Sequence, residues 1–210
     1  MFDWHTIDYH EIRRHYDHRV RTHQLLLKYF HEKDMENYVN LALGIDDPAG
    51  NYSASDHGSG PEILRNKHTY ELVFQLAEKL IACEEPSRIP DIIYSTNISG
   101  LKISIGSEMA ALLRPELFWV VNTRTVWAHF VIKYDSVDQG NEVLKAFHEN
   151  RPSNMDYYLW KDVCPDVGLS MASLATMATT ICKETGIIQG ELTYLWADAV
   201  ADVAYNMYSK

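Results

Sequence analysis

Histidines gather near the start of the chain, where six of the ten lie within the first 31 residues. Glu11, His15 and His18 follow one another at i, i+4 and i+7, so a helix places a carboxylate and two imidazoles on one face. Such groups are ligands that zinc, iron and manganese accept in proteins. The spacing makes Glu11, His15 and His18 candidate metal ligands, with a divalent metal as the alternative to a protein without a cofactor.

The surroundings of this face argue against a metal ion. A metal site on a helix usually completes its ligand set from a second helix, and the sequence holds no Glu-x-x-His pair to supply one. Arginines at positions 13, 14, 19 and 21 also bring positive charge to the segment, which repels a cation. The three candidate ligands are therefore expected on the surface, and no cofactor is expected.

A second group of polar side chains lies in the most apolar segment of the chain, residues 115–134. Here Asn122, Thr125 and His129 share one helical face, and Arg124 points to the other. A buried polar group without a partner costs about 1 to 3 kcal/mol, so each needs a carboxylate of another helix or a ligand. Three carboxylates are candidate partners: Glu108, Asp198 and Asp202.

An apolar pocket with a few convergent polar groups is typical of a small-molecule site, here for an anionic or aromatic molecule. The candidate ligand-binding residues are Asn122, Arg124, Thr125, Trp127 and His129, together with Arg114 at the preceding turn.

Motifs for nucleotide binding and for a serine nucleophile are absent from the sequence. There is no Gly-x-x-x-x-Gly-Lys loop and no Gly-x-Gly-x-x-Gly loop. Ser107 follows a glycine, but a nucleophile elbow requires Gly-x-Ser-x-Gly, which the neighbours of Ser107 do not form. Ser107 is interpreted as an ordinary helix residue.

The charge of the chain disfavours nucleic acid as a partner. Nineteen Lys and Arg stand against 29 Asp and Glu, for a formal net charge of −10, and phosphate repels an acidic protein. Residues 178–195 have the spacing of a helix-turn-helix. The second helix, however, carries Glu191, Asp198 and Asp202 where basic or amide side chains should face DNA. DNA binding is the least favoured function.

The sequence predicts a cytoplasmic protein with no membrane contact. Three widely spaced cysteines are typical of a reducing compartment rather than of a disulfide framework. No stretch approaches the roughly 18 apolar residues that a membrane span needs, and the N-terminus lacks the pattern of a secretory signal.

Hydrophobic periodicity predicts an all-α protein, a single domain over residues 1–210 with seven to nine helices around a buried central helix. Thr6 is the expected N-cap of the first helix, and a flexible loop is expected at residues 46–60. The expected helices cover residues 7–32, 35–43, 61–83, 101–113, 115–134 at the centre, 138–149, 155–184 with a break or kink at Pro165 and Gly168, and 189–208.

These patterns favour a non-catalytic binding or interaction protein with a small-ligand pocket. The many Tyr and Trp residues, 13 and 5, favour a homodimer, because both are enriched at protein interfaces. A protein partner is a further option. The alternative is a helical-bundle hydrolase or oxygenase that uses a divalent metal on the N-terminal histidines.

Overall fold

The computed structural model describes residues 2–47, 53–56, 58–149 and 157–209, which form α-helices and short 3-10 helices without a strand. The all-α class is therefore confirmed. The described residues hold eleven α-helices, more than the seven to nine expected. The helices are α1 (Tyr9–Glu32), α2 (Met35–Ala42), α3 (Ser53–Asp56), α4 (Ser59–Ile63), α5 (His68–Ile81), α6 (Ile89–Ser95), α7 (Ile103–Leu113), α8 (Thr123–Tyr134), α9 (Val137–Glu149), α10 (Tyr157–Thr185) and α11 (Thr193–Tyr208), with 3-10 helices η1 (Trp4–Thr6) and η2 (Pro86–Arg88).

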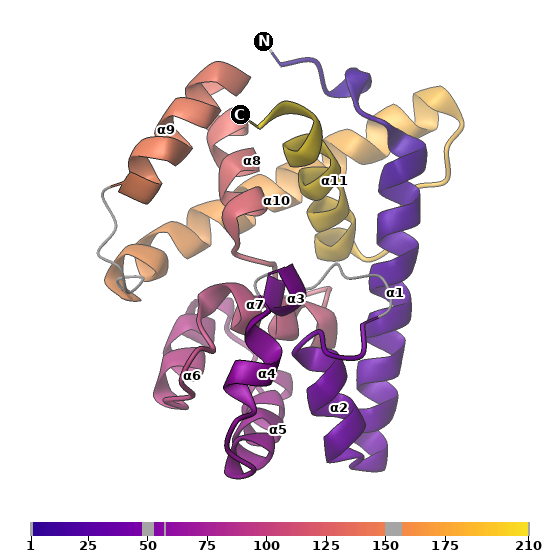
Figure 1. Ribbon diagram of the computed structural model, residues 1–210. Coiled ribbons are helices and arrows are strands. Elements are labelled where there is room, and N and C mark those ends of the chain that lie inside the picture. Colours follow the sequence, from indigo (N-terminus) through magenta and orange to yellow (C-terminus); the bar gives the residue numbers. More distant parts are fainter. Residues whose placement is uncertain (1, 48–52, 57, 150–156, 210) are drawn as a thin grey trace.

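The helices form two groups that the long helix α1 joins (Figure 1). At one end α2 packs on α1 and α5, while α7 packs on α1, α5 and α6. At the other end α8 packs against α9, α10 and α11, and α11 also packs on α1. One cluster of buried apolar side chains includes members of both groups, and the largest fully buried side chains in it are Trp127 and Trp196.

The local sequence explains where α1 begins and ends. The Asp8 side chain accepts hydrogen bonds from the backbone N–H groups of His10 and Glu11, which satisfies two donors of the first turn. Lys33 closes the helix in the left-handed region at φ 56°. The expected N-cap Thr6 lies instead at the end of η1.

The central helix is shorter than expected, because α8 begins at Thr123 rather than near Pro115. Asn122 forms a capping box with Thr125, which starts the helix at this point. Seven residues of α8 are nevertheless buried, from Thr125 to Val131. The apolar composition of residues 115–122 correctly indicated a buried segment, but these residues do not form part of the helix.

Three further expectations change. The segment expected as one helix over 61–83 divides into α4 and α5, and α6 was not expected at all. Helix α10 continues through Pro165 without a break. The expected loop at 46–60 contains α3 and the start of α4; its residues 48–52 and 57 lie outside the described part of the chain.

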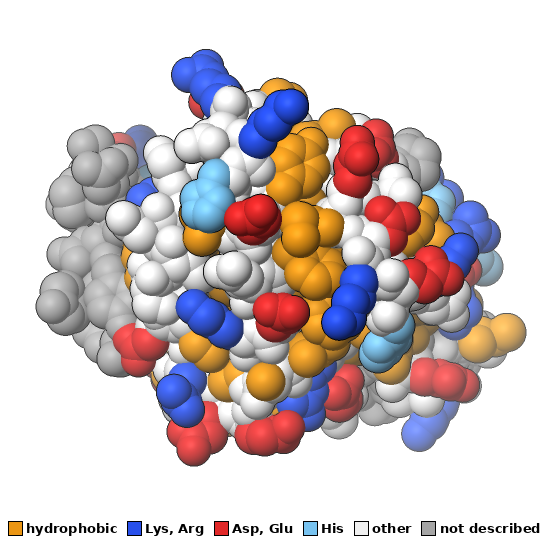
Figure 2. All heavy atoms as spheres, turned by 90° about the horizontal axis from the view of Figure 1, so that it is seen from below, with side chains coloured by type: hydrophobic (Ala, Val, Ile, Leu, Met, Phe, Trp, Pro, Cys, Tyr) orange, Lys and Arg blue, Asp and Glu red, His pale blue; other side chains and the backbone are white. Residues whose placement is uncertain are grey.

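Helices α2 to α7 form one end of the molecule (Figure 1), and we call them the α2–α7 group. The surface at this end shows Lys, Arg, Asp and Glu side chains mixed around a stripe of hydrophobic side chains (Figure 2). Within the described residues, no helix combines the length and the apolarity that crossing a bilayer demands.

Candidate functional site

The polar residues expected to bind a ligand start and fix α8. The Asn122 Oδ1 atom accepts from the backbone N–H groups of Arg124 and Thr125, at 3.0 and 3.1 Å. In return the Thr125 hydroxyl accepts from the N–H of Asn122 at 3.0 Å. Both side chains are buried and mutually satisfied, so they act as a helix cap.

Trp127 and His129 are also held by other helices. The Trp127 Nε1 atom donates to the side-chain oxygen of Asn141 on α9 at 2.7 Å. The His129 Nδ1 atom lies 2.8 Å from the Ser170 hydroxyl on α10. Burial, together with the charge of Lys133, lowers the pKa of His129 and so favours its neutral form.

Arg114 lies apart from these side chains, at the end of α7. It donates to the backbone carbonyl of Cys83 at 2.9 Å and pairs with Glu84 and Glu116. The structure therefore does not gather the six expected residues around one space, and none of them lines the cavity beside α10 or the one between α1 and α2.

Arg124 belongs instead to a buried ionic network, formed by residues that α1, α7, α8 and α11 supply. We use this name for six side chains: His15, Arg19, Glu108, Arg124, Asp198 and Asp202. The Arg19 guanidinium lies between two carboxylates, 2.5 Å from Glu108 and 3.1 Å from Asp198. Asp202 lies 2.8 Å from both the Arg124 Nε atom and the His15 Nδ1 atom. The pairing of Arg124 with Asp202 was among the alternatives expected from sequence.

The deepest member of the network is Glu108, whose exposed fraction is 0%. Its Oε2 atom accepts from the backbone N–H of Ser53 at 2.8 Å, which ties α3 to the network. Its Oε1 atom faces Arg19 as an ion pair without the geometry of a hydrogen bond.

Burial and pairing move the pKa values of the network in opposite directions. Burial raises the pKa of Glu108 and of Asp198 in spite of the Arg19 charge. Burial also acts upward on Asp202, but its hydrogen bond with His15 and the charge of Arg124 hold its pKa below the ordinary value. The hydrogen bond with Asp202 raises the pKa of His15. With His15 protonated and all carboxyls ionised, three positive charges balance three negative charges.

The expected metal ligands are only partly brought together. His15 Nε2 and Glu11 Oε1 are 3.2 Å apart, but the other imidazole nitrogen of His15 contacts Asp202. His18 instead lines a pocket between α1 and α2. Among the described residues, no group of three or more His, Cys, Asp or Glu side chains has a geometry that could hold a metal ion.

The helix that would have to read DNA in a helix-turn-helix lies in the core. Every residue of α11 from Leu195 to Ala204 is buried, and the helix packs against α1, α8 and α10. A recognition helix must present one face to the major groove. This packing leaves α11 no such face.

An apolar groove lies alongside α10. We call it the α10 groove; its volume is about 590 Å³. Its walls come from η2, α6, α10, the segment before α8 and the start of α11. The lining residues are Pro86, Ser87, Pro90, Trp119, Cys164, Pro165, Gly168, Leu169, Ala172 and Tyr194.

Two aromatic rings form one wall of the α10 groove. The rings of Trp119 and Tyr194 lie 5.4 Å apart between centroids, and the Trp119 Nε1 atom donates to the carbonyl of Cys164 at 2.9 Å. The indole lies against Gly168, where a Cβ atom would come within 2.4 Å of the ring. Glycine at this position is therefore what allows Trp119 to lie against α10.

The groove is uncharged at physiological pH. None of its lining residues is Asp, Glu, Lys, Arg or His. Burial raises the pKa of the Cys164 thiol to about 12 and also raises the pKa of Tyr194. The polar side-chain groups at the groove are thus neutral: the hydroxyls of Ser87 and Tyr194 and the thiol of Cys164.

The sequence alone did not predict the groove, because its walls come from segments more than 100 residues apart. Comparison of the chain with models of known protein families, with curated proteins and with solved structures gave no match.

Proposed function

We propose that this protein is a non-catalytic binding protein that takes a small, uncharged, aromatic molecule into the α10 groove. The observation that carries the proposal is the groove itself, with its volume of about 590 Å³ and its wall of Trp119 and Tyr194. Ligand pockets typically measure about 300 to 1,000 Å³ and are lined mainly by apolar and aromatic side chains.

The chemistry of the lining favours a neutral ligand over an anionic one. An anion needs a cationic side chain or free N–H donors, and the lining supplies no Lys, Arg or His. Aromatic rings prefer offset or edge-to-face neighbours at centroid distances of about 4.5 to 7 Å, and such pairs add about 0.5 to 1.5 kcal/mol beyond burial. The hydroxyls of Ser87 and Tyr194 can orient one polar group of the ligand.

Titration with N-phenyl-1-naphthylamine, an uncharged aromatic dye that brightens in apolar surroundings, tests this function. Leu169 is 73% exposed and lines the groove, so Leu169→Ala removes a contact without opening the core. We expect the dissociation constant of the dye for Leu169→Ala to rise about tenfold, which corresponds to about 1.4 kcal/mol. Ile188→Ala is the matched control, because Ile188 is 75% exposed and lies outside the groove.

A second pair of variants fills the groove. Ala172→Phe places a ring inside it and should abolish dye binding, whereas Ser173→Phe adds the same ring at an exposed neighbouring position that does not line the groove. If Ala172→Phe, folded by circular dichroism, binds the dye as tightly as Ser173→Phe and the unsubstituted protein do, the dye binds elsewhere and the α10 groove is rejected.

The remaining expectations stay predictions. A homodimer in a cytoplasmic setting is part of the proposal, and sedimentation velocity at several concentrations measures the oligomeric state. For the metal-dependent hydrolase or oxygenase, the described residues offer no group of three ligands, since His18 does not join Glu11 and His15.

A further inference from the structure

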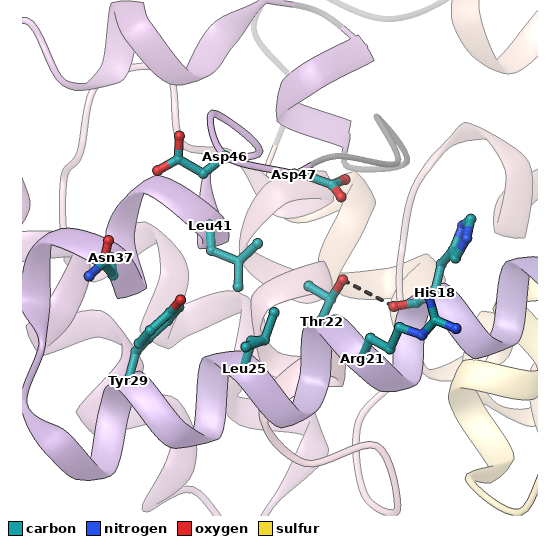
Figure 3. Close-up of a pocket in the computed structure, with 9 residues that line it drawn as sticks. All are labelled: His18, Arg21, Thr22, Leu25, Tyr29, Asn37, Leu41, Asp46 and Asp47. Carbon is teal, nitrogen blue, oxygen red and sulfur yellow. Dashed lines mark hydrogen bonds between the residues drawn. The ribbon is translucent and has the colours of Figure 1, made fainter.

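A second cavity lies between α1, α2 and the residues that follow α2, remote in sequence from the α10 groove. We call it the α1–α2 pocket; its volume is about 360 Å³. It differs from the α10 groove in carrying charges of both signs. The lining residues are His18, Arg21, Thr22, Leu25, Tyr29, Asn37, Leu41, Asp46 and Asp47 (Figure 3).

The basic side chains of this pocket and the Asp46 carboxylate lie at opposite ends. Arg21 and His18 lie at one end, Asp46 lies toward the other end near Asn37, and Asp47 lies between the two ends (Figure 3). The apolar side chains of Leu25 and Leu41 lie between the two ends (Figure 3). The pocket is therefore dipolar, with an apolar floor.

The cation of this pocket is unpaired, unlike its neighbours on α1. Arg13 pairs with Asp17, Arg14 pairs with Glu11, and Arg19 pairs within the buried ionic network. Arg21 has no carboxylate partner among the described residues, although Asp46 and Asp47 line the same pocket. The guanidinium of Arg21 is thus available to an anionic group.

Two further features of the pocket indicate a missing partner. The His18 Nδ1 atom is buried and has no hydrogen-bond partner within the described structure. A buried polar atom left in this state costs about 1 to 3 kcal/mol, which a ligand can recover. Leu25 on the floor is 40% exposed, so apolar surface is open there as well.

We infer that the α1–α2 pocket binds a small zwitterion whose carboxylate and ammonium groups are separated by a short aliphatic chain. The carboxylate lies against Arg21 and His18, and the ammonium lies against Asp46. The aliphatic chain covers Leu25 and Leu41. This site is independent of the ligand proposed for the α10 groove.

The test is an NMR titration of amide shifts with 6-aminohexanoate and 4-aminobutanoate at low ionic strength, because salt screens exposed charges. Norleucine is the matched control, since it is an isomer of 6-aminohexanoate whose ammonium and carboxylate groups are attached to the same carbon. Hexanoate and hexylamine each carry one of the two charges. We expect saturable shifts at α1 and α2 with at least one separated zwitterion and at least tenfold weaker binding of the three controls.

Variants assign the two ends of the pocket. Arg21→Gln and Asp46→Asn should each weaken binding of the zwitterion at least tenfold. Arg14→Gln, an exposed arginine on the same helix but outside the pocket, and Asp138→Asn on α9 should leave it unchanged. Leu169→Ala in the α10 groove should also have no effect.

Three results would overturn the inference: no saturable shifts at millimolar concentrations of both zwitterions, equal binding of norleucine, or unchanged binding by Arg21→Gln. Weakening by Asp46→Asn with unchanged binding by Arg21→Gln would identify an ammonium site only, which also contradicts the zwitterion.

Discussion

Arg19 is a charged side chain that lies in the core. It is 7% exposed and bridges two carboxylates that burial would otherwise leave unpaired. Breaking a buried ion pair by removing one partner costs about 3 to 5 kcal/mol, because the other charge stays buried. Arg19 is therefore expected to be among the most sensitive charged positions of the chain.

We predict that Arg19→Met lowers the free energy of unfolding by about 3 to 5 kcal/mol at pH 7. The loss should be smaller at pH 5. Glu108 and Asp198 have raised pKa values in the folded state, so their stabilising contribution is complete below the unfolded pKa and is lost as the pH rises through the folded value. Without Arg19, the ionised carboxylates of Glu108 and Asp198 destabilise the folded state further, and protonation at lower pH relieves part of this cost. Urea unfolding at both pH values measures the difference.

Arg14→Met is the matched control, because the Arg14 side chain is 59% exposed and pairs with Glu11 across one turn of the same helix. Exposed pairs of this kind contribute about 0 to 1 kcal/mol. A loss at Arg19 no larger than that at Arg14, or a loss that grows at pH 5, would contradict the role given to Arg19.

The sequence contained a signal for Arg19 that charge counting missed. Positions 12, 16, 19 and 26 are all buried on α1, and they recur at the spacing of one helical face. An arginine within an apolar stripe indicates a buried cation with carboxylate partners. The acids Glu108, Asp198 and Asp202 were recognised as available partners, but periodicity does not specify which helices lie side by side.

At the scale of elements, helix existence was easier to predict than helix boundaries. The strongly amphipathic segments gave α1, α2 and α9 nearly correctly, since a repeated apolar face depends on local sequence alone. The segment before α8 was misassigned because it is apolar throughout, and a buried extended segment and a buried helix look alike by composition. Asn122, interpreted as a ligand-binding residue, was the boundary signal.

This assignment of Asn122 predicts the effect of two substitutions. Asn122→Ala should lower the free energy of unfolding by about 1 kcal/mol, because α8 loses the acceptor for the N–H groups of Arg124 and Thr125. Asn122→Ser should retain most of the stability, since serine is an equally good N-cap. Chemical denaturation of both variants measures the two values. If the serine variant were as unstable as the alanine variant, Asn122 would not act through the cap.

At the scale of the molecule, the arrangement of α1 bears on whether the two helix groups fold together. Helix α1 packs on α2 and α7 in one group and on α11 in the other (Figure 1). The buried ionic network lies where these contacts meet, since Glu108 belongs to α7 and Asp198 and Asp202 belong to α11. Opening one group alone would expose charges whose partners remain in the other.

We therefore predict that the chain unfolds as one cooperative unit, in agreement with the single domain expected from the sequence. Native-state hydrogen exchange can test this. Leu76 on α5 and Leu174 on α10 are both 0% exposed and lie in different groups. Replacing either with Ala should cost about 2 to 5 kcal/mol. In a cooperative unit, each variant lowers the protection of the slowest amides equally in α7 and in α11. Two independent units would instead confine the effect of Leu76→Ala to the α2–α7 group and that of Leu174→Ala to the α8–α11 group.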